Sequence, residues 1–334
     1  MRRIAKVMVA FICLLPNPAA AEPINLKLSF FTSDRSQIYQ GSVKPFVDAV
    51  NAEGNGLLHI EVYFSGAISG DLTRLPQLVS DGTADLALVV PGRTPDRFHD
   101  TSALELAGLF RDASEASQVF AQLASDGMLS GYEEFHVVCA FVAGAESIHS
   151  RKPIASIADL TGLTVRVDNL TQADTLQRLG AVPVLLSINQ TTEAVSNGTI
   201  DAATFPPSML FEFGIGRVAT HHYMMRLGGA PVALLMNREK FKSLPEQAQA
   251  LINKYGGRWL MEQSGKYFGE LDRHVLEDLE ADHRRTVVFP DAADEKVIQP
   301  VFRDVIEQYA ESSDHNRELL ARVRAELAKL RTTE

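Results

Sequence analysis

One arginine stands in the middle of a short predicted strand. Residues 163–167, Leu-Thr-Val-Arg-Val, alternate apolar and polar side chains, which is the pattern of a strand with one apolar face. A guanidinium offers a planar pair of donors that matches a carboxylate, and it keeps its charge at physiological pH. Arg166 is therefore either a solvated residue of an edge strand or the anchor of a site for a carboxylate.

Motifs for catalysis or metal binding are weak or absent. The sequence contains no His-Glu-x-x-His, Gly-x-Ser-x-Gly or phosphate-loop pattern and no Cys cluster with metal spacing. Residues 214–219, Gly-Ile-Gly-Arg-Val-Ala, have the letters of a dinucleotide fingerprint but follow a helix-like stretch, so we expect a glycine turn there. The adjacent pair His221 and His222 is expected to be polar surface or interface. The pattern favours binding over catalysis, with no catalytic residue, cofactor or metal.

The N-terminus predicts export. Arg2, Arg3 and Lys6 give a basic start, residues 7–15 are apolar, and small residues precede a cleavage site after Ala21. The apolar run is shorter than the ~20 residues that span a bilayer. We expect residues 1–21 to be a cleaved signal peptide and the mature chain to be exported and soluble, without direct membrane insertion.

Composition and charge narrow the class of partner. At 334 residues, two lobes are expected, and 46% apolar and 22% charged residues are typical of a soluble globular protein. Cleavage takes the basic count from 32 to 29 against 42 acids, a net charge of about −13 with His neutral. Nucleic acid and anionic membranes are therefore disfavoured as partners. Cys139, the one cysteine left after cleavage, is expected to be a buried, inert thiol.

Two segments carry the same β-α-β-α-β pattern. In the first, the predicted strands are 24–31, 57–64 and 84–90, and the helices are 36–52 and 71–80; in the second, the strands are 163–167, 181–186 and 200–205, and the helices are 171–179 and 189–197. Residues 79–87 and 195–203 also match at six of nine positions, with Gly82 and Gly198 expected as left-handed helix ends. We therefore predict an α/β protein with two similar lobes.

The rest of the chain is expected to join and brace these lobes. Residues 230–237 predict a strand, Ser243-Leu-Pro-Glu246 predicts a capping box that opens one very long helix towards Asp282, and a last strand at 286–289 precedes two charged helices. The expected division gives 22–143 plus about 231–275 to the first lobe. The second lobe then takes 144–230 plus about 276–334.

Ligands of such folds bind between the lobes, at the carboxyl ends of parallel strands. This rule selects the strand ends at 31–33, 90–92, 167–169 and 205–207. Arg166 lies at the third of these, so the sequence favours a cleft position for its guanidinium.

The chain resembles the periplasmic solute-binding subunits of tripartite ATP-independent periplasmic (TRAP) transporters over essentially its whole mature length. The likeness is carried by residues 62–71, 81–92, 152–167, 179–187, 197–207 and 232–249, above all by Lys-Pro-Ile, Asp-Leu-x-Gly-Leu and Val-Arg-Val in the third of these. It implies a class-II-like binding protein that closes on a carboxylate-bearing solute and delivers it to a membrane permease driven by an ion gradient. It also implies that Arg166 pairs with the ligand carboxylate.

Two departures from the family bear on the ligand. Many members carry a second Arg about twenty residues before the first, whereas residues 143–147 here are Ala-Gly-Ala-Glu-Ser. Those members also have Asn where this chain has Phe205. We therefore expect one carboxylate on an apolar or aromatic body that stacks on Phe205, unless Phe205 is core packing. A second cation from Arg93 or Arg97, in a loop that resembles a "TPxRF" motif, would restore a dicarboxylate or sugar acid.

Further wall residues are expected by resemblance and by position. The resemblance suggests Val90, Pro91, Asn169, Leu186 and Ser187, and strand-end position with loose alignment suggests Ser33 and Asp71. Two alternatives to transport stay open. One is an exported two-lobed α/β enzyme, which a perturbed acid–base pair beside Arg166 would favour. The other is a sensory binding protein that presents its ligand to a receptor.

Overall fold

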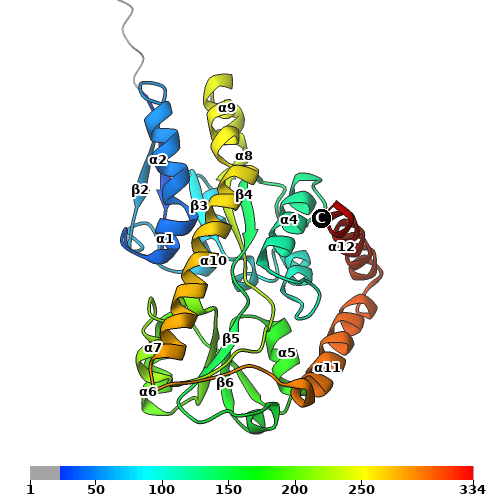
Figure 1. Ribbon diagram of the computed structural model, residues 1–334. Coiled ribbons are helices and arrows are strands. Elements are labelled where there is room, and N and C mark those ends of the chain that lie inside the picture. The colour runs from blue at the N-terminus through cyan, green and yellow to red at the C-terminus, as the bar shows by residue number, and fades with distance from the viewer. Residues whose placement is uncertain (1–22, 334) are drawn as a thin grey trace, which may run out of the picture.

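The computed structural model describes residues 23–333, and it consists of two α/β lobes stacked one above the other (Figure 1). The predicted signal peptide lies outside the described residues. The first sheet has the order β2-β1-β3-β10-β4, and the second has the order β11-β9-β5-β8-β6-β7. Their bounds are β1 Ile24–Ser29, β2 Leu58–Tyr63, β3 Leu86–Val89, β4 Phe135–Val142, β5 Ser147–Ser150, β6 Thr164–Val167, β7 Val182–Leu185, β8 Ala202–Phe205, β9 His221–Tyr223, β10 Pro231–Asn237 and β11 Thr286–Val288.

The repeated unit is confirmed in both lobes. β1 pairs in parallel with β2 and β3, and β6 pairs in parallel with β7 and β8. The connecting elements are α1 Gln37–Ser42, α2 Lys44–Glu53, the 3-10 turn η1 Leu72–Arg74, α3 Leu75–Ser80, α5 Leu170–Arg178 and α6 Ile188–Asn197. The predicted helix 36–52 is two helices, because Pro45 in the first turn of α2 lacks the N–H that a continuous helix would need. Gly82 and Gly198 have left-handed φ values of 75° and 81°, as expected for these turns.

Two paired segments carry the chain between the lobes. One runs from β4 to β5 and the other from β9 to β10, and they are hydrogen-bonded between Ala143 N and Ala230 O at 2.8 Å and between Glu146 N and Gly228 O at 2.8 Å. β10 then inserts antiparallel between β3 and β4. Cys139 is buried in β4, as the sequence predicted. These two segments form a narrow two-stranded crossing between the two sheets.

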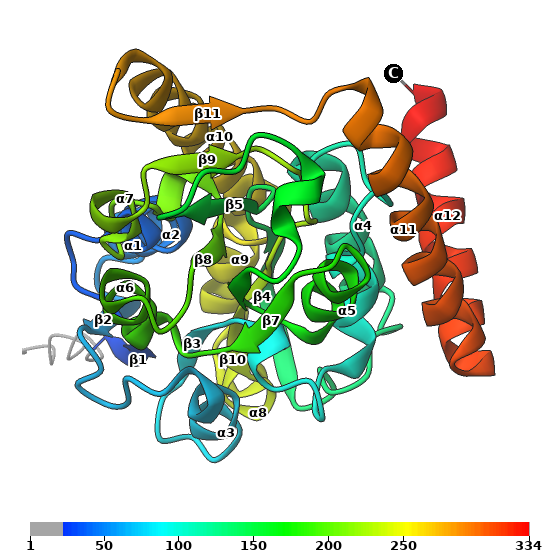
Figure 2. The same cartoon turned by 90° about the horizontal axis from the view of Figure 1, so that it is seen from below.

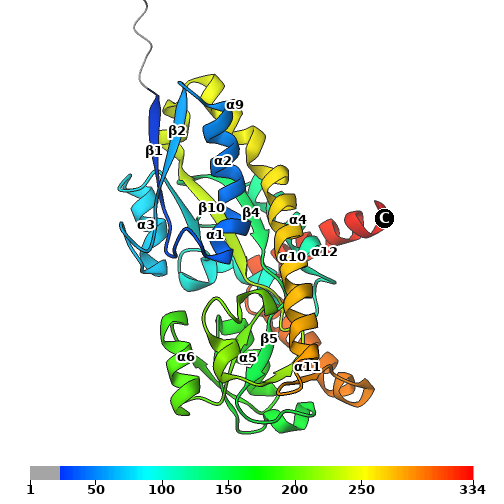
Figure 3. The same ribbon diagram turned by 60° about the vertical axis from the view of Figure 1, so that its left-hand side comes forward.

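The predicted long helix is broken into pieces. α9 Glu246–Tyr255 and α10 Gly257–Ala281 replace it, with the break at Gly257, whose φ of 50° interrupts a helix; a separate short helix, α8 Arg238–Ser243, precedes them. The capping box at Ser243 is wrong, because its hydroxyl donates to the Lys240 carbonyl instead. The bracing role is confirmed: α10 extends along both lobes and contacts both β4 and β11 (Figure 3).

The C-terminal helices differ from the expected division of the chain. α11 Ala292–Glu311 links the lobes and lies beside α12 Asp314–Thr333 (Figure 2). α12 packs on α4 Ala113–Ser125 and on the 3-10 turn η3 His99–Glu105 of the first lobe. Leu319, Leu320 and Val323 of α12 belong to the first lobe's apolar core, so the assignment of residues 314–333 to the second lobe was wrong. Among residues 23–333, no helix combines the length and apolar character of a membrane span.

Candidate functional site

A cavity of about 110 Å³ lies between the lobes where parallel strands end. Its walls are mostly apolar and come from both lobes: Phe31, Ile38, Leu72, Leu88, Val90, Phe141, Ile188, Phe205, Met209, Phe213, Val232 and Phe268. Four charged residues also line it: Arg93, Glu146, Arg166 and Asp168. Charges inside so apolar a space must be balanced by their neighbours, because buried unpaired charges are costly.

Arg166 is held rigidly at the floor of this cavity. β6 has a neighbour on each side, so the side chain is only 1% exposed, and the interpretation as a solvated edge-strand residue is wrong. Its Nε donates to the Leu186 carbonyl at 3.2 Å, and its Nη1 donates to the Thr204 carbonyl at 3.2 Å. The Phe205 ring centre lies 4.9 Å from the guanidinium carbon, within reach of a cation–π contact.

Asp168 is paired with two guanidiniums, Arg166 of its own lobe and Arg93 of the other lobe. It follows β6 and accepts a hydrogen bond from Arg166 Nη2 at 2.5 Å. Its same oxygen accepts from Arg93, which ends the 3-10 turn η2 Pro91–Arg93 after β3 in the other lobe. Burial acts to raise the pKa of Asp168, but the two guanidiniums outweigh burial and lower it. Asp168 is therefore an ionised carboxylate shared by two cations.

Glu146 adds an acid to the same wall. It lies at the end of the crossing from β4 to β5, directly before β5, is 3% exposed, and its Oε2 has no hydrogen-bond partner among the described residues. Burial and the nearby charge of Asp168 raise its pKa, while Arg166 acts against this. With Glu146 protonated, the two guanidiniums and Asp168 leave a net charge of +1 in the cavity.

Sequence reasoning missed both acids. Asp168 stands inside the 167–169 strand end, so its position was a usable signal. Glu146 lies twenty residues before Arg166, in the segment that was considered only for its missing base. Their partners in the fold come from distant parts of the chain, and this pairing has no local sequence signal.

The other predicted site residues fall into two groups. Phe205, Val90 and Arg93 line the cavity with Arg166, and Leu186 contributes its carbonyl to the guanidinium. The following do not line it: Pro91 is buried in η2, Asn169 caps α5 by accepting from Gln172 N at 2.8 Å, Ser187 bonds Gln190, Asp71 caps η1, and the Ser33 carbonyl accepts from Ser36 N.

Arg97 is directed away from the cavity. Its guanidinium pairs with Glu134 and donates to Ser80 Oγ at 2.9 Å, and it lies 4.8 Å from the centre of the Phe135 ring. Of the two candidate second cations, the structure therefore brings Arg93, and not Arg97, to Arg166.

The His pair is partly buried, contrary to expectation. His222 on β9 is 1% exposed, and its Nδ1 lies 2.8 Å from Nδ1 of His149. His149 Nε2 lies 3.0 Å from the Phe205 carbonyl, so this ring donates there and accepts from His222. Burial lowers the pKa of both rings, to about 4 for His149 and about 3 for His222. The neutral pair fixes the backbone behind Phe205.

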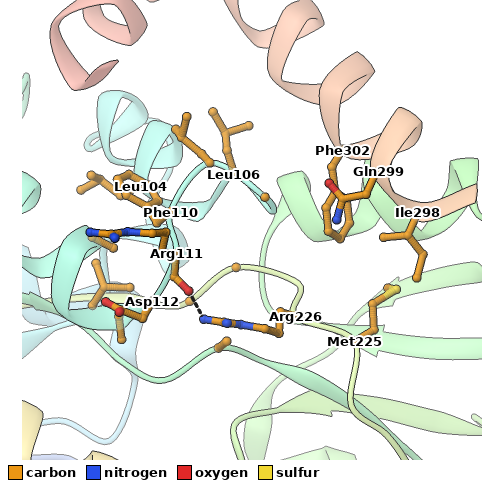
Figure 4. A pocket seen from close by; sticks show the side chains of 18 of the residues that line it. Leu104, Leu106, Phe110, Arg111, Asp112, Met225, Arg226, Ile298, Gln299 and Phe302 are labelled. Atoms are coloured by element: carbon orange, nitrogen blue, oxygen red, sulfur yellow. Dashed lines mark hydrogen bonds between the residues drawn. The ribbon is translucent and has the colours of Figure 1, made fainter. Parts of the chain in front are cut away.

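A larger cavity, of about 640 Å³, lies beside the crossing segments (Figure 4). Its labelled walls include Phe110, Met225 and Phe302, and Arg226 donates to the Arg111 carbonyl across it. Arg226 is exposed, and Arg111 is paired with Glu115. This cavity lacks the buried cation that a carboxylate site requires, so the smaller cavity is the candidate site.

Two α/β lobes, a two-stranded crossing and a cavity at facing strand ends define a two-lobed binding protein. Residues 28–312 match the model of the bacterial extracellular solute-binding proteins, family 7 (DctP), and the chain belongs to this family. It is 25% identical over 324 residues to the C4-dicarboxylate-binding periplasmic protein DctP of Rhodobacter capsulatus, covering 92% of this chain and 95% of that one.

Solved TRAP solute-binding proteins share the fold. One from a marine metagenome, specific for aromatic acid ligands and bound to metahydroxyphenylacetate, matches with a TM-score of 0.85 and 24% identity over 92% of this chain and 99% of its own. One from Rhodoferax ferrireducens, bound to copurified benzoate, matches with a TM-score of 0.84 and 24% identity over 93% of this chain and 99% of its own. The chain is thus a transport solute-binding protein and not an enzyme, although a buried acid with a raised pKa does lie beside Arg166.

Proposed function

We propose that the protein captures an organic monocarboxylate with an apolar or aromatic body in the periplasm and delivers it to a TRAP membrane permease. The observation that carries this proposal is the charge balance of an otherwise apolar cavity. With Glu146 protonated, as it is below its raised pKa of about 7, the two guanidiniums and ionised Asp168 leave one positive charge, which a single ligand carboxylate neutralises.

Arg166 has capacity for that carboxylate. Three of its five N–H groups already have acceptors on Leu186, Thr204 and Asp168. Two N–H groups are left for a ligand within the part of the chain that the structure describes. Because the protein acceptors fix the guanidinium, little side-chain freedom is lost when a ligand binds.

The cavity walls suit an apolar or aromatic body. Five phenylalanines line the cavity, and Phe205 lies against the guanidinium while its ring centre is 6.0 Å from that of Phe213. A flat ring next to the carboxylate would add a further aromatic contact to this tilted pair. The aromatic-acid and benzoate complexes of the two solved TRAP proteins agree with this choice.

A dicarboxylate fits the charge balance less well. Arg93 is the second cation of the cavity, but it already pairs with Asp168. A second ligand carboxylate would bring an unneutralised negative charge into apolar surroundings, which costs several kcal/mol. The relationship to a C4-dicarboxylate-binding protein makes this the comparison to test.

We further propose that binding closes the lobes. Contacts across the interlobe space include the Arg93–Asp168 pair and the bond from Gln37 N to Glu212 Oε2 at 3.1 Å. A ligand that touches both lobes favours the closed population. Small-angle scattering should show compaction at saturating benzoate if benzoate binds, and an unchanged radius of gyration would contradict closure.

The direct test is calorimetry and thermal shift on residues 22–334. The panel is benzoate, 3-hydroxybenzoate, succinate and glucuronate; a ligand at 100 times its Kd adds ~2.7 kcal/mol to stability. We expect the aromatic acids to bind, and Arg166→Gln to weaken them by a factor of 30 or more, since truncating a buried charge pair costs about 2–5 kcal/mol. Arg97→Gln is the matched control and should bind as wild type does. Binding of succinate or glucuronate alone would overturn the monocarboxylate assignment.

A further inference from the structure

His99, Asp100 and His315 form a cluster in the first lobe, apart from the residues that line the ligand cavity. His99 and Asp100 begin η3, and His315 lies in the first turn of α12, which packs on η3. The ligand atoms of the three side chains lie within 4.8 Å of one another. This juxtaposition has no local sequence motif, because 215 positions separate Asp100 from His315.

The carboxylate is oriented towards the two rings. Asp100 is fully buried, and its Oδ2 accepts from Ser130 N at 2.8 Å and from Ser130 Oγ at 2.7 Å. Its Oδ1 lies 2.7 Å from His315 Nε2 and 3.1 Å from His99 Nε2. Ser130 thus holds one carboxylate oxygen and leaves the other to face both imidazoles, which is the outer-shell arrangement found around metal ligands.

The charges also suit a cation. Burial acts to raise the pKa of Asp100, but the hydrogen bonds from Ser130 and His315 and the charge of His99 outweigh burial and lower the pKa. Asp100 is therefore ionised while fully buried. The rings are 56% and 52% exposed, so an ion can enter from solvent.

We propose that His99, Asp100 and His315 bind a divalent transition-metal ion of the zinc type. Two imidazole nitrogens and one carboxylate oxygen are a ligand set that Zn²⁺ accepts, with water in the fourth position. Bonds of ~2.0–2.1 Å around a tetrahedral ion place ligand atoms about 3.3 Å apart, a spacing that needs only small shifts of the two rings. The ion ties the start of α12 to η3 and so fastens the C-terminal helix to the first lobe.

The test uses tag-free residues 22–334, stripped of metal with a chelator and titrated with ZnCl₂. We expect one site per chain by calorimetry and a higher melting temperature in the presence of Zn²⁺. His99→Ala and His315→Ala should each raise the Kd for Zn²⁺ at least tenfold and remove most of the thermal shift. Because both rings are half-exposed, these variants should fold, and their metal-free melting temperatures check this directly.

His274→Ala and His283→Ala are the matched controls, since both histidines are exposed and lie outside the cluster. They should bind Zn²⁺ as wild type does. Failure of wild type to bind Zn²⁺, or equal binding by the His99→Ala/His315→Ala double variant, would show that the cluster is a hydrogen-bonded His–Asp–His contact only. The proposal is independent of the ligand, so benzoate affinity should not change with either His variant.

Discussion

Asp168→Asn is the change that most directly tests the charge balance of the ligand cavity. The substitution keeps the shape of the side chain and an acceptor oxygen for Arg166 and Arg93, but it removes the ionised carboxylate that the two guanidiniums share. The cavity charge rises from +1 to +2. We therefore expect the preference to shift from monoanions towards dianions.

The size of the shift follows from Coulomb's law. Asp168 and a ligand carboxylate that share one guanidinium lie roughly 5 Å apart, which corresponds to about 3 kcal/mol at an effective dielectric constant of about 20. Removing Asp168 relieves this repulsion once for a monocarboxylate and about twice for a dicarboxylate. The ratio of succinate to benzoate affinity should therefore rise by about 100-fold.

Calorimetry of both ligands at pH 6, below the pKa of about 7 to which Glu146 is raised in wild type, gives this ratio. Glu146 complicates the interpretation of this ratio, because the charge of Asp168 is one cause of the raised pKa of Glu146. In Asp168→Asn the pKa of Glu146 would fall, and ionised Glu146 would replace the missing negative charge. The double variant Asp168→Asn/Glu146→Gln removes that response and should show the full shift. A ratio within threefold of wild type in the double variant would refute the charge-balance reasoning, even if Arg166 proves essential.

Three further outcomes are expected. Arg93→Gln should weaken benzoate binding at least tenfold by calorimetry, because the complex then carries an unneutralised negative charge, whereas Arg97→Gln should change it less than twofold. Phe205→Leu should cost about 0.5–1.5 kcal/mol of benzoate affinity, and equal binding would place this ring in the core only. Burial, then the charges of Asp168 and Glu146, raise the pKa of Glu105 to about 8. The folded state therefore binds more protons than the unfolded state between about pH 4.5 and 8. The free energy of unfolding consequently falls as pH rises through this window. Glu105→Gln should reduce the loss of melting temperature from pH 5 to pH 8, and an unchanged loss would contradict the raised pKa.

The strands and helix ends were predicted correctly where they depend on local sequence patterns. Alternating strands and Gly-terminated helices are set by neighbouring residues, so both β-α-β-α-β units and the turns at Gly82 and Gly198 agree with the structure. The predicted capping box at Ser243 was wrong because Pro245 is the N-cap of α9 and the Ser243 hydroxyl donates to the Lys240 carbonyl. The lobe on which α12 packs was not predictable, because it depends on which lobe presents an apolar surface to Leu320 in the folded protein.

The position of the candidate site was predictable from the sequence, but the charge partners within it were not. The strand-end rule places Arg166 and Phe205 at the cleft because it needs only the order of strands. It does not say what neutralises the guanidinium. Asp168 and Arg93 are 75 residues apart and belong to different lobes, so their pairing follows from how the lobes face each other.

In the proposed closure, that pairing would make closing depend on the ligand. In an open state Arg93 and Asp168 would be separated and solvated, and closing would enclose two guanidiniums, one ionised carboxylate and a largely apolar wall. With Glu146 protonated, an empty closed cavity would then hold one unneutralised positive charge, which costs several kcal/mol. A monocarboxylate removes this cost and adds apolar contacts with both lobes, so closure becomes favourable only when the ligand is present. Neutral analogues such as benzamide, which fill the same space without charge, should therefore fail to close the lobes in scattering measurements under conditions where benzoate succeeds.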